Sequence, residues 1–155
     1  MNFFSYLHRQ KQEDRQAFII YFPASSGKTQ FALRACEIDP GIFYLDLLSY
    51  FLSKPAINVN DYDLEKYKKL LLHTIVFPPG THTILVDNGD FLFNTWKDPV
   101  KRSFIDWLRN PLRTPAVTDK THIFMIQTDG VLSAAELKNT LGEPRVLAIN
   151  QFDAI

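Results

Sequence analysis

Five short apolar runs recur along the chain, separated by longer and more polar stretches. They span residues 17–22, 42–48, 83–88, 121–128 and 145–150, and β-branched and aromatic side chains are frequent in them. Short, nearly continuous apolar runs of this kind are typical of strands that are buried on both faces of a sheet. The pattern therefore predicts five buried strands.

Between these runs the apolar residues recur with helical spacing. We predict helices over residues 2–15, 28–37, 95–108 and 133–141, and one of about 15 residues within 58–76. Asp61 or Asp63 can cap the helix within 58–76. Ser133 and Glu136 have the spacing of a capping box, and Gly142 can end that helix. Strands that alternate with helices predict an α/β fold of three layers, with a five-stranded, mostly parallel sheet and helices on both faces.

Composition narrows the class of protein. The 155 residues suit a single domain over 1–155, and 46% apolar with 22% charged residues is typical of a soluble globular protein, not a disordered one. Because the formal net charge is zero, overall charge does not indicate a DNA-coating protein, although a local basic face stays open. Cys36, the one cysteine, excludes an internal disulfide and fits a cytoplasmic protein. No apolar run approaches the roughly 18 residues that span a bilayer, and the N-terminus does not resemble a signal peptide, so we expect no membrane association.

The stretch YFPASSGKT, residues 21–29, joins the first strand to the next helix. It matches the phosphate-binding pattern G-x-x-x-x-G-K-[ST], except that Phe22 stands where the first glycine belongs. Small residues let backbone N–H groups converge on phosphate, Lys28 would reach the β- and γ-phosphates, and the Thr29 hydroxyl would bind Mg²⁺. Since a residue before proline favours extended geometry, Phe22-Pro23 alters the entry to the loop and leaves its phosphate-facing end intact. The predicted nucleotide-binding residues are Pro23, Ala24, Ser25, Ser26, Gly27, Lys28, Thr29 and Gln30.

A second motif supports this interpretation. The apolar strand in TILVDN ends in Asp87, where a carboxylate would hold Mg²⁺ beside Thr29, since the carboxyl ends of parallel strands share one edge of the sheet. Alone, Asp87 would be read as a turn or cap residue, but the two motifs in this order predict binding of ATP and Mg²⁺. Asn88 follows it, and an amide positions a water without accepting its proton. Asp90 is either a substitute base or a helix cap. We therefore expect a slow or partner-stimulated ATPase.

The order of these motifs resembles the core of the AAA+ P-loop NTPases. The resemblance implies a polar sensor-1 residue at the end of the fourth strand, which is Thr128 or Asp129. It also implies that Arg145 is an arginine finger that reaches the γ-phosphate of a neighbouring subunit, and hence a homo-oligomer. The alternative for Arg145 is an exposed arginine at a strand edge. Because the chain ends after the fifth strand, the helical lid of a typical AAA+ protein is expected to be absent.

The segments FPASSGKT and ILVDN, together with the size of the chain, also resemble the small P-loop proteins of type 3 BREX phage-exclusion systems, the BrxF family. That resemblance implies an antiphage role in bacteria, beside a larger ATPase, a methyltransferase and a phosphatase-like protein. The ILVDNGD segment is also similar to the corresponding region of the DnaA-related initiators and regulators.

Two other functional hypotheses remain open. The first is a non-catalytic adaptor or DNA-associated regulator that keeps the fold for its shape. If two basic helical stretches share a side, DNA contact would come from Lys66, Lys68, Lys69, Lys97, Lys101, Arg102, Arg109 and Arg113. The second, a small-molecule kinase, lacks a visible arginine-rich lid. For Phe104 and Trp107, which share a helix face, we expect a place in the core or in a subunit interface.

Overall fold

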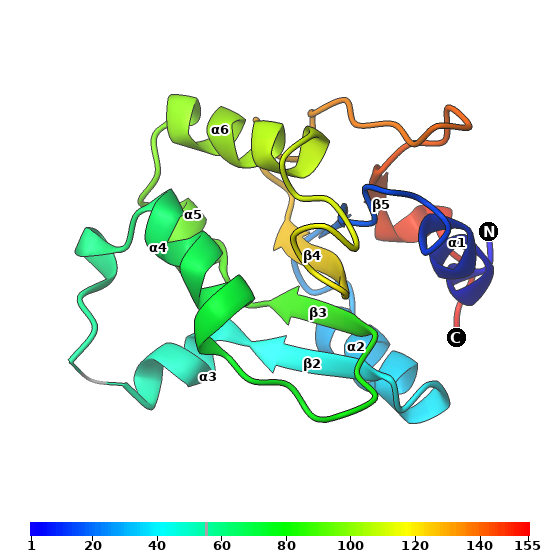
Figure 1. Ribbon diagram of the computed structural model, residues 1–155, viewed down its shortest axis with the longest axis horizontal. Coiled ribbons are helices and arrows are strands. Elements are labelled where there is room, and N and C mark those ends of the chain that lie inside the picture. The colour runs from blue at the N-terminus through cyan, green and yellow to red at the C-terminus, as the bar shows by residue number, and fades with distance from the viewer. Residues whose placement is uncertain (55) are drawn as a thin grey trace.

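The computed structural model describes residues 1–54 and 56–155 and contains one parallel sheet of five strands. The strands are β1 (Phe18–Phe22), β2 (Ile42–Asp46), β3 (Thr83–Asp87), β4 (Thr121–Gln127) and β5 (Val146–Ala148). Their order in the sheet is β2-β3-β4-β1-β5, and every neighbouring pair is parallel (Figure 1). The five predicted strands are confirmed, and the sheet is wholly parallel.

Alternation along the strands divides the core into two halves. On β1, Phe18, Ile20 and Phe22 face one cluster of buried side chains, whereas Ile19 faces the other. The helices α1 (Phe3–Gln10) and α2 (Lys28–Ile38) supply the first cluster. The second receives side chains from α3 (Leu47–Leu52), α4 (Leu64–Lys69), α5 (Asp90–Phe93) and α6 (Asp98–Arg109). Helices therefore cover both faces of the sheet, as the predicted three-layer α/β architecture requires (Figure 1).

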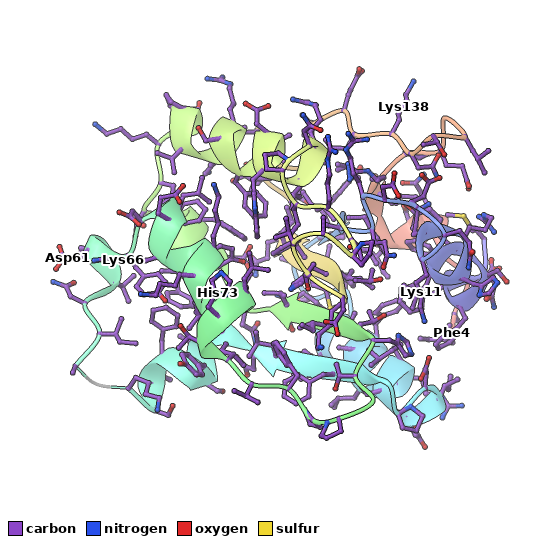
Figure 2. The ribbon with its side chains drawn as sticks, viewed as in Figure 1. Phe4, Lys11, Asp61, Lys66, His73 and Lys138 are labelled. Carbon is purple, nitrogen blue, oxygen red and sulfur yellow. The ribbon has the colours of Figure 1, made fainter. Side chains whose placement is uncertain are left out.

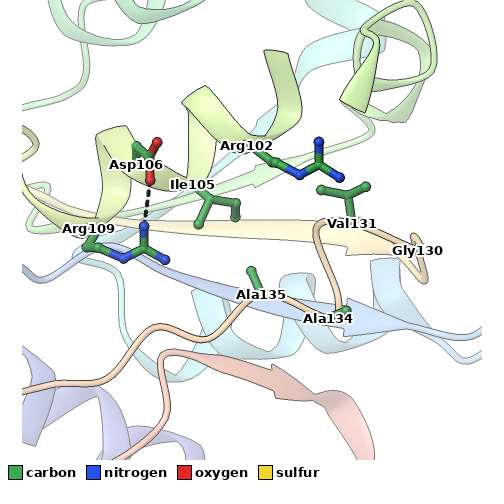
Figure 3. Close-up of a pocket in the computed structure, with 8 residues that line it drawn as sticks. All are labelled: Arg102, Ile105, Asp106, Arg109, Gly130, Val131, Ala134 and Ala135. Atoms are coloured by element: carbon green, nitrogen blue, oxygen red, sulfur yellow. Dashed lines mark hydrogen bonds and ion pairs between the residues drawn. The ribbon is translucent and has the colours of Figure 1, made fainter. Parts of the chain in front are cut away.

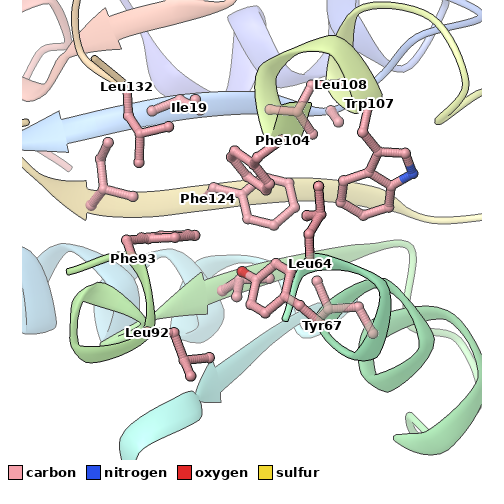
Figure 4. Packing of buried hydrophobic residues seen from close by; sticks show 14 of the residues in the cluster. Ile19, Leu64, Tyr67, Leu92, Phe93, Phe104, Trp107, Leu108, Phe124 and Leu132 are labelled. Carbon is pink, nitrogen blue, oxygen red and sulfur yellow. The ribbon is translucent and has the colours of Figure 1, made fainter. Parts of the chain in front are cut away.

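The second half of the core is rich in aromatic rings (Figure 4). Phe104 of α6 is fully buried, and its ring meets that of Phe124 on β4 edge-on, with centroids 5.0 Å apart. Tyr67, Phe93 and Trp107 pack around the same pair. Edge-to-face pairs are favourable beyond the area that they bury. The face shared by Phe104 and Trp107 is thus a core face of the subunit.

Several predicted helix bounds were wrong. The first helix ends at Gln10, because the charged residues that follow offer no apolar face to bury. The helix within 58–76 begins at Leu64, where Asp63 Oδ1 accepts a hydrogen bond from Lys66 N at 2.9 Å, and it continues as a π-helical turn over Leu70–Thr74. The helix predicted over 95–108 begins only at Asp98, with a proline in its first turn.

The helix predicted over 133–141 does not form. Ser133 Oγ accepts a hydrogen bond from Asp129 N at 2.7 Å instead of capping a helix. Farther along, Asn139 Oδ1 accepts bonds from Leu141 N and Glu143 N, which closes a turn, and Arg145 N donates to Leu137 O at 2.7 Å. Local side-chain bonds and pairing to the start of β5 therefore replace the helical bonds.

Within the part of the chain that the structure describes, no helix has both the length and the apolar character needed to cross a membrane.

Candidate functional site

The connection from β1 to α2 is a tight loop with two left-handed residues. Gly27, at the N-cap of α2, has φ +79°, and Ser25 has φ +59°. A Cβ added at Gly27 would meet only Gln30 Oε1, at 3.8 Å, so backbone conformation rather than space calls for glycine there. β1 runs to Phe22, whose carbonyl accepts a hydrogen bond from Thr128 N at 3.1 Å. The loop is thus entered from an extended residue, as the Phe22-Pro23 pair predicts.

This loop lines an open pocket of about 550 Å³, a size suited to a small organic ligand. Residues 22–30 and Gln127 line it, so all eight predicted nucleotide-binding residues lie together. The first N–H groups of an α-helix have no intrahelical acceptor, and the helix dipole makes this end positive. α2, with 11 residues, therefore presents an electropositive terminus to the pocket.

The ammonium group of Lys28 lies among polar side chains at and after the end of β3. Its Nζ lies 2.7 Å from Asp87 Oδ1, 3.3 Å from Asn88 Oδ1 and 3.7 Å from Asp90 Oδ2. Asp87 is fully buried, whereas Lys28 keeps 14% of its side chain exposed. A buried carboxylate needs a nearby positive charge and hydrogen-bond donors. The structure therefore brings the two predicted motifs into direct contact.

Both carboxylate oxygens of Asp87 also accept neutral hydrogen bonds. Asn88 N donates to Oδ1 at 2.7 Å, and Tyr44 on β2 donates its hydroxyl proton to Oδ2 at 2.5 Å. The Tyr44 hydroxyl is within hydrogen-bonding reach of the Thr29 side chain as well. Burial, and next the bond to Asp87, raise the pKa of Tyr44 well above its usual range, so its phenol stays a donor.

The donor set at this edge suits Mg²⁺. Thr29 and Asp87 supply a hydroxyl and a carboxylate, and Mg²⁺ prefers oxygen ligands. Among the described residues no three His, Cys, Asp or Glu side chains gather as a cation site. Mg²⁺ in nucleotide sites needs no such group, since it is held by one or two carboxylates together with phosphates and water.

Thr128 and Asp129 lie at the same edge of the sheet, with different surroundings. Both residues line a small cavity of about 60 Å³ together with Asp90, so both lie near the Lys28 cluster, but their hydrogen bonds differ. Asp129 is bonded to Lys101 Nζ at 2.7 Å and accepts from Val131 N and Leu132 N. Burial raises the pKa of Asp129, but the Lys101 bond and these N–H groups lower it overall. Its carboxylate thus organises the following loop.

Arg145 is buried, whereas an arginine finger and an exposed arginine at a strand edge would both need an accessible side chain. Only 1% of its surface is accessible, Nη1 donates to Ala17 O at 3.1 Å, and both Nη1 and Nη2 donate to Leu108 O at 3.0 Å. Burial lowers the pKa of Arg145 to about 10. It also precedes β5, whereas the 21–29 loop follows β1, so in this parallel sheet it lies at the opposite edge from the pocket. The arginine-finger prediction and the exposed-edge alternative are both wrong for Arg145.

The two basic helical stretches do cover one face of the sheet, and ion pairs reduce their charge. Lys68 of α4 lies over the ring of Trp107 on α6, 5.7 Å from its centroid. Lys101 is paired with Asp129 and Lys68 with Glu65, and Lys66 Nζ donates to the main-chain oxygen of Asp61, in the turn before α4 (Figure 2).

A second pocket, of about 420 Å³, lies between α6 and residues 130–135. Arg102 and Arg109 flank it, and Arg109 is paired with Asp106 (Figure 3). The positive charge on this face is therefore modest.

Sequence reasoning missed Gln127, which lines the pocket of residues 22–30, and Tyr44, which is bonded to Asp87. Gln127 ends β4, and its N–H donates to Asp90 Oδ1 at 2.9 Å. For Tyr44 one signal was available: an aromatic hydroxyl two residues before the end of a strand points to the same face as that strand's last residue.

Comparison of the chain with protein-family models, with curated proteins and with solved structures finds no match.

Proposed function

We propose that this chain is an AAA+-like P-loop protein that binds ATP together with Mg²⁺ and hydrolyses it slowly. The observation that carries the proposal is the contact between Lys28 Nζ and Asp87 Oδ1, 2.7 Å apart, beside the pocket lined by residues 22–30. A lysine, a hydroxyl residue and a strand-end carboxylate meeting at the N-terminus of a helix is the arrangement that phosphate transfer uses.

In this proposal each group has one role. The N–H groups at the start of α2 receive the phosphates, and Lys28 leaves Asp87 to bind the β- and γ-phosphate oxygens. Thr29 and Asp87 would hold Mg²⁺, which neutralises phosphate charge when it is bound.

Slow hydrolysis follows from the residues around the phosphates. Asn88 follows Asp87 and has φ +55°, and its amide orients a water without taking its proton. Asp90 uses Oδ1 to accept the bond from Gln127 N, and its Oδ2 is 3.7 Å from Lys28, so it has a structural role. Arg145 is buried and supplies no charge in trans. We propose that a partner, either another subunit or another defence protein, supplies what is missing.

The biological setting that we propose is a bacterial antiphage system of the BREX type, in the cytoplasm. Its support is the pair of motifs at residues 22–29 and 84–88, together with an α/β domain of 155 residues. The second setting that we propose is that of a DNA-associated regulator. The observation in its favour is the pocket flanked by Arg102 and Arg109, although the pairing of Arg109 with Asp106 reduces its positive charge.

Calorimetric titration with ATP and ADP in MgCl₂ tests the proposal. We expect the wild-type protein to bind and Lys28→Ala to lose roughly a hundredfold or more in affinity, since a lysine–phosphate contact is charge-assisted. Lys138→Ala removes an exposed lysine far from the pocket and should bind as the wild type does.

The same titration separates the proposal from a non-catalytic adaptor. A ligand that binds only the folded state must raise its stability. If millimolar ATP with Mg²⁺ neither releases heat nor raises the melting temperature of the wild type, the result contradicts the proposal and favours the adaptor hypothesis. Equal affinity in Lys28→Ala and the wild type would instead show that the ligand binds elsewhere.

A further inference from the structure

Tyr44 belongs to neither motif, yet its side chain connects them. It lies on β2, which pairs with β3 in a register that sets Tyr44 against Leu85 and Asp46 against Asp87. Tyr44 packs against the half of the core that α2 covers, and Leu85 lies in that half too. Since strand side chains alternate, Asp87 points to the same face as Leu85. The Tyr44 phenol is therefore placed between the end of β3 and the first turn of α2.

The contacts of the phenol are specific. Its hydroxyl donates to Asp87 Oδ2 at 2.5 Å, and the Thr29 side chain is within hydrogen-bonding reach of the same oxygen. A short O–H···O⁻ bond to a carboxylate is among the stronger hydrogen bonds in proteins. Of the two residues that would hold Mg²⁺ in the proposed function, Tyr44 thus donates to Asp87 and lies close to Thr29.

We propose that Tyr44 is a positioning residue for the metal, holding Asp87 and Thr29 in the arrangement that binds Mg²⁺. The inference rests on the proposed function, because it assigns a role within the same site. When Lys28 turns to the phosphates, Asp87 loses its ion-pair partner and keeps the bonds from Asn88 N and Tyr44. The bond from Tyr44 to Oδ2 would then keep the carboxylate from rotating, so that Asp87 would stay in place to hold the metal.

The opposite role predicts an opposite result. If the Tyr44 hydroxyl occupied the position that Mg²⁺ or its water needs, it would compete with the metal and its removal would strengthen metal binding. Hydrogen-bonded partners of metal-binding carboxylates usually strengthen the site, and losing one costs on the order of tenfold in metal affinity.

The experiment is a titration of MgCl₂ at fixed ATP concentration, read by calorimetry, for the wild type and Tyr44→Phe. We expect the Mg²⁺ concentration at half-saturation to rise about tenfold in Tyr44→Phe. Affinity for ATP in EDTA should stay as in the wild type, because phosphate contacts at the loop are unchanged. Electron paramagnetic resonance of Mn²⁺, used in place of Mg²⁺, should show the same loss and reads the metal directly.

Tyr21→Phe is the matched control. Tyr21 lies on β1 just before the loop, and its hydroxyl makes no hydrogen bond to the residues that the structure describes. It should leave the Mg²⁺ requirement unchanged.

An unchanged or lower Mg²⁺ requirement in Tyr44→Phe overturns the positioning role and leaves the proposed function intact. If the wild type itself binds no ATP with Mg²⁺, the proposed function fails, and this inference fails with it.

Discussion

Lys28 Nζ lies 2.7 Å from Asp87 Oδ1, although the strands that carry them toward each other, β1 and β3, are separated in the sheet by β4. Lys28 reaches Asp87 because it is the first residue of α2, and α2 begins at the carboxyl edge of the sheet, where β3 ends. Asp87 is fully buried at the end of β3. The ion pair therefore connects the start of α2 to the end of β3 at the candidate site.

Removing one partner of this pair should destabilise the protein without any ligand. Lys28→Met leaves the buried carboxylate of Asp87 without its counter-charge, and we expect the free energy of unfolding to fall by about 3 kcal/mol. Urea denaturation measures it. The double variant Lys28→Met/Asp87→Asn removes both charges and should recover most of the loss. A single variant as stable as the wild type would show that the pair is not formed in solution.

The left-handed backbone at Gly27 gives a second prediction. Gly27→Ala puts a Cβ on a residue with φ +79° and should lower the free energy of unfolding by about 1 kcal/mol. Gly130→Ala is the control, because an added Cβ there meets no atom within 4 Å and no positive φ opposes it. It should raise the free energy of unfolding by about 0.5 kcal/mol, through the entropy of the unfolded chain. Equal effects at the two positions would mean that the loop does not adopt this conformation.

For Arg145 we predict a stability effect in place of a catalytic one. Arg145→Ala removes the bonds to Ala17 O and Leu108 O and leaves a cavity, so the free energy of unfolding should fall by about 3 kcal/mol. Arg102→Ala, on the exposed side of α6, should change it by less than about 0.5 kcal/mol. A stable Arg145→Ala protein with impaired subunit assembly would restore the arginine-finger interpretation.

His122 on β4 makes stability depend on pH. It is almost fully buried beside Phe124, and desolvation lowers its pKa from 6.5 to about 4. Between these values the unfolded chain takes up a proton that the folded protein does not. The free energy of unfolding therefore falls as pH drops from 6.5 to 4, by about 3 kcal/mol in total from this residue.

His122→Leu removes this proton uptake. Denaturation at pH 7, 5.5 and 4 should show a shallower loss in the variant than in the wild type. Identical slopes would show that the His122 ring becomes protonated without unfolding the protein.

The pattern of apolar residues over short stretches of the chain predicted the fold well. Runs such as 17–22 and 42–48 have the composition of buried strands, and a helix between successive strands leads to a parallel sheet. Helix ends were less predictable. The capping-box spacing at Ser133 and Glu136 did not produce a helix, because Ser133 and the neighbouring backbone found partners in Asp129 and at the start of β5. Propensity is a weak prior where tertiary bonds compete.

By itself, the sequence determined the five strands and the 21–29 loop with its glycine, because both depend on residues that are adjacent in the chain. It also indicated that Asp87 ends a strand at the same edge as the loop. Only the tertiary structure decided which side chains meet there. Tyr44 lies at the site because β2 pairs with β3. Arg145 lies away from the site, at the opposite edge of the sheet, where it is bonded to α6. Such contacts depend on strand order and side-chain burial, which link residues far apart in the chain and leave no local pattern.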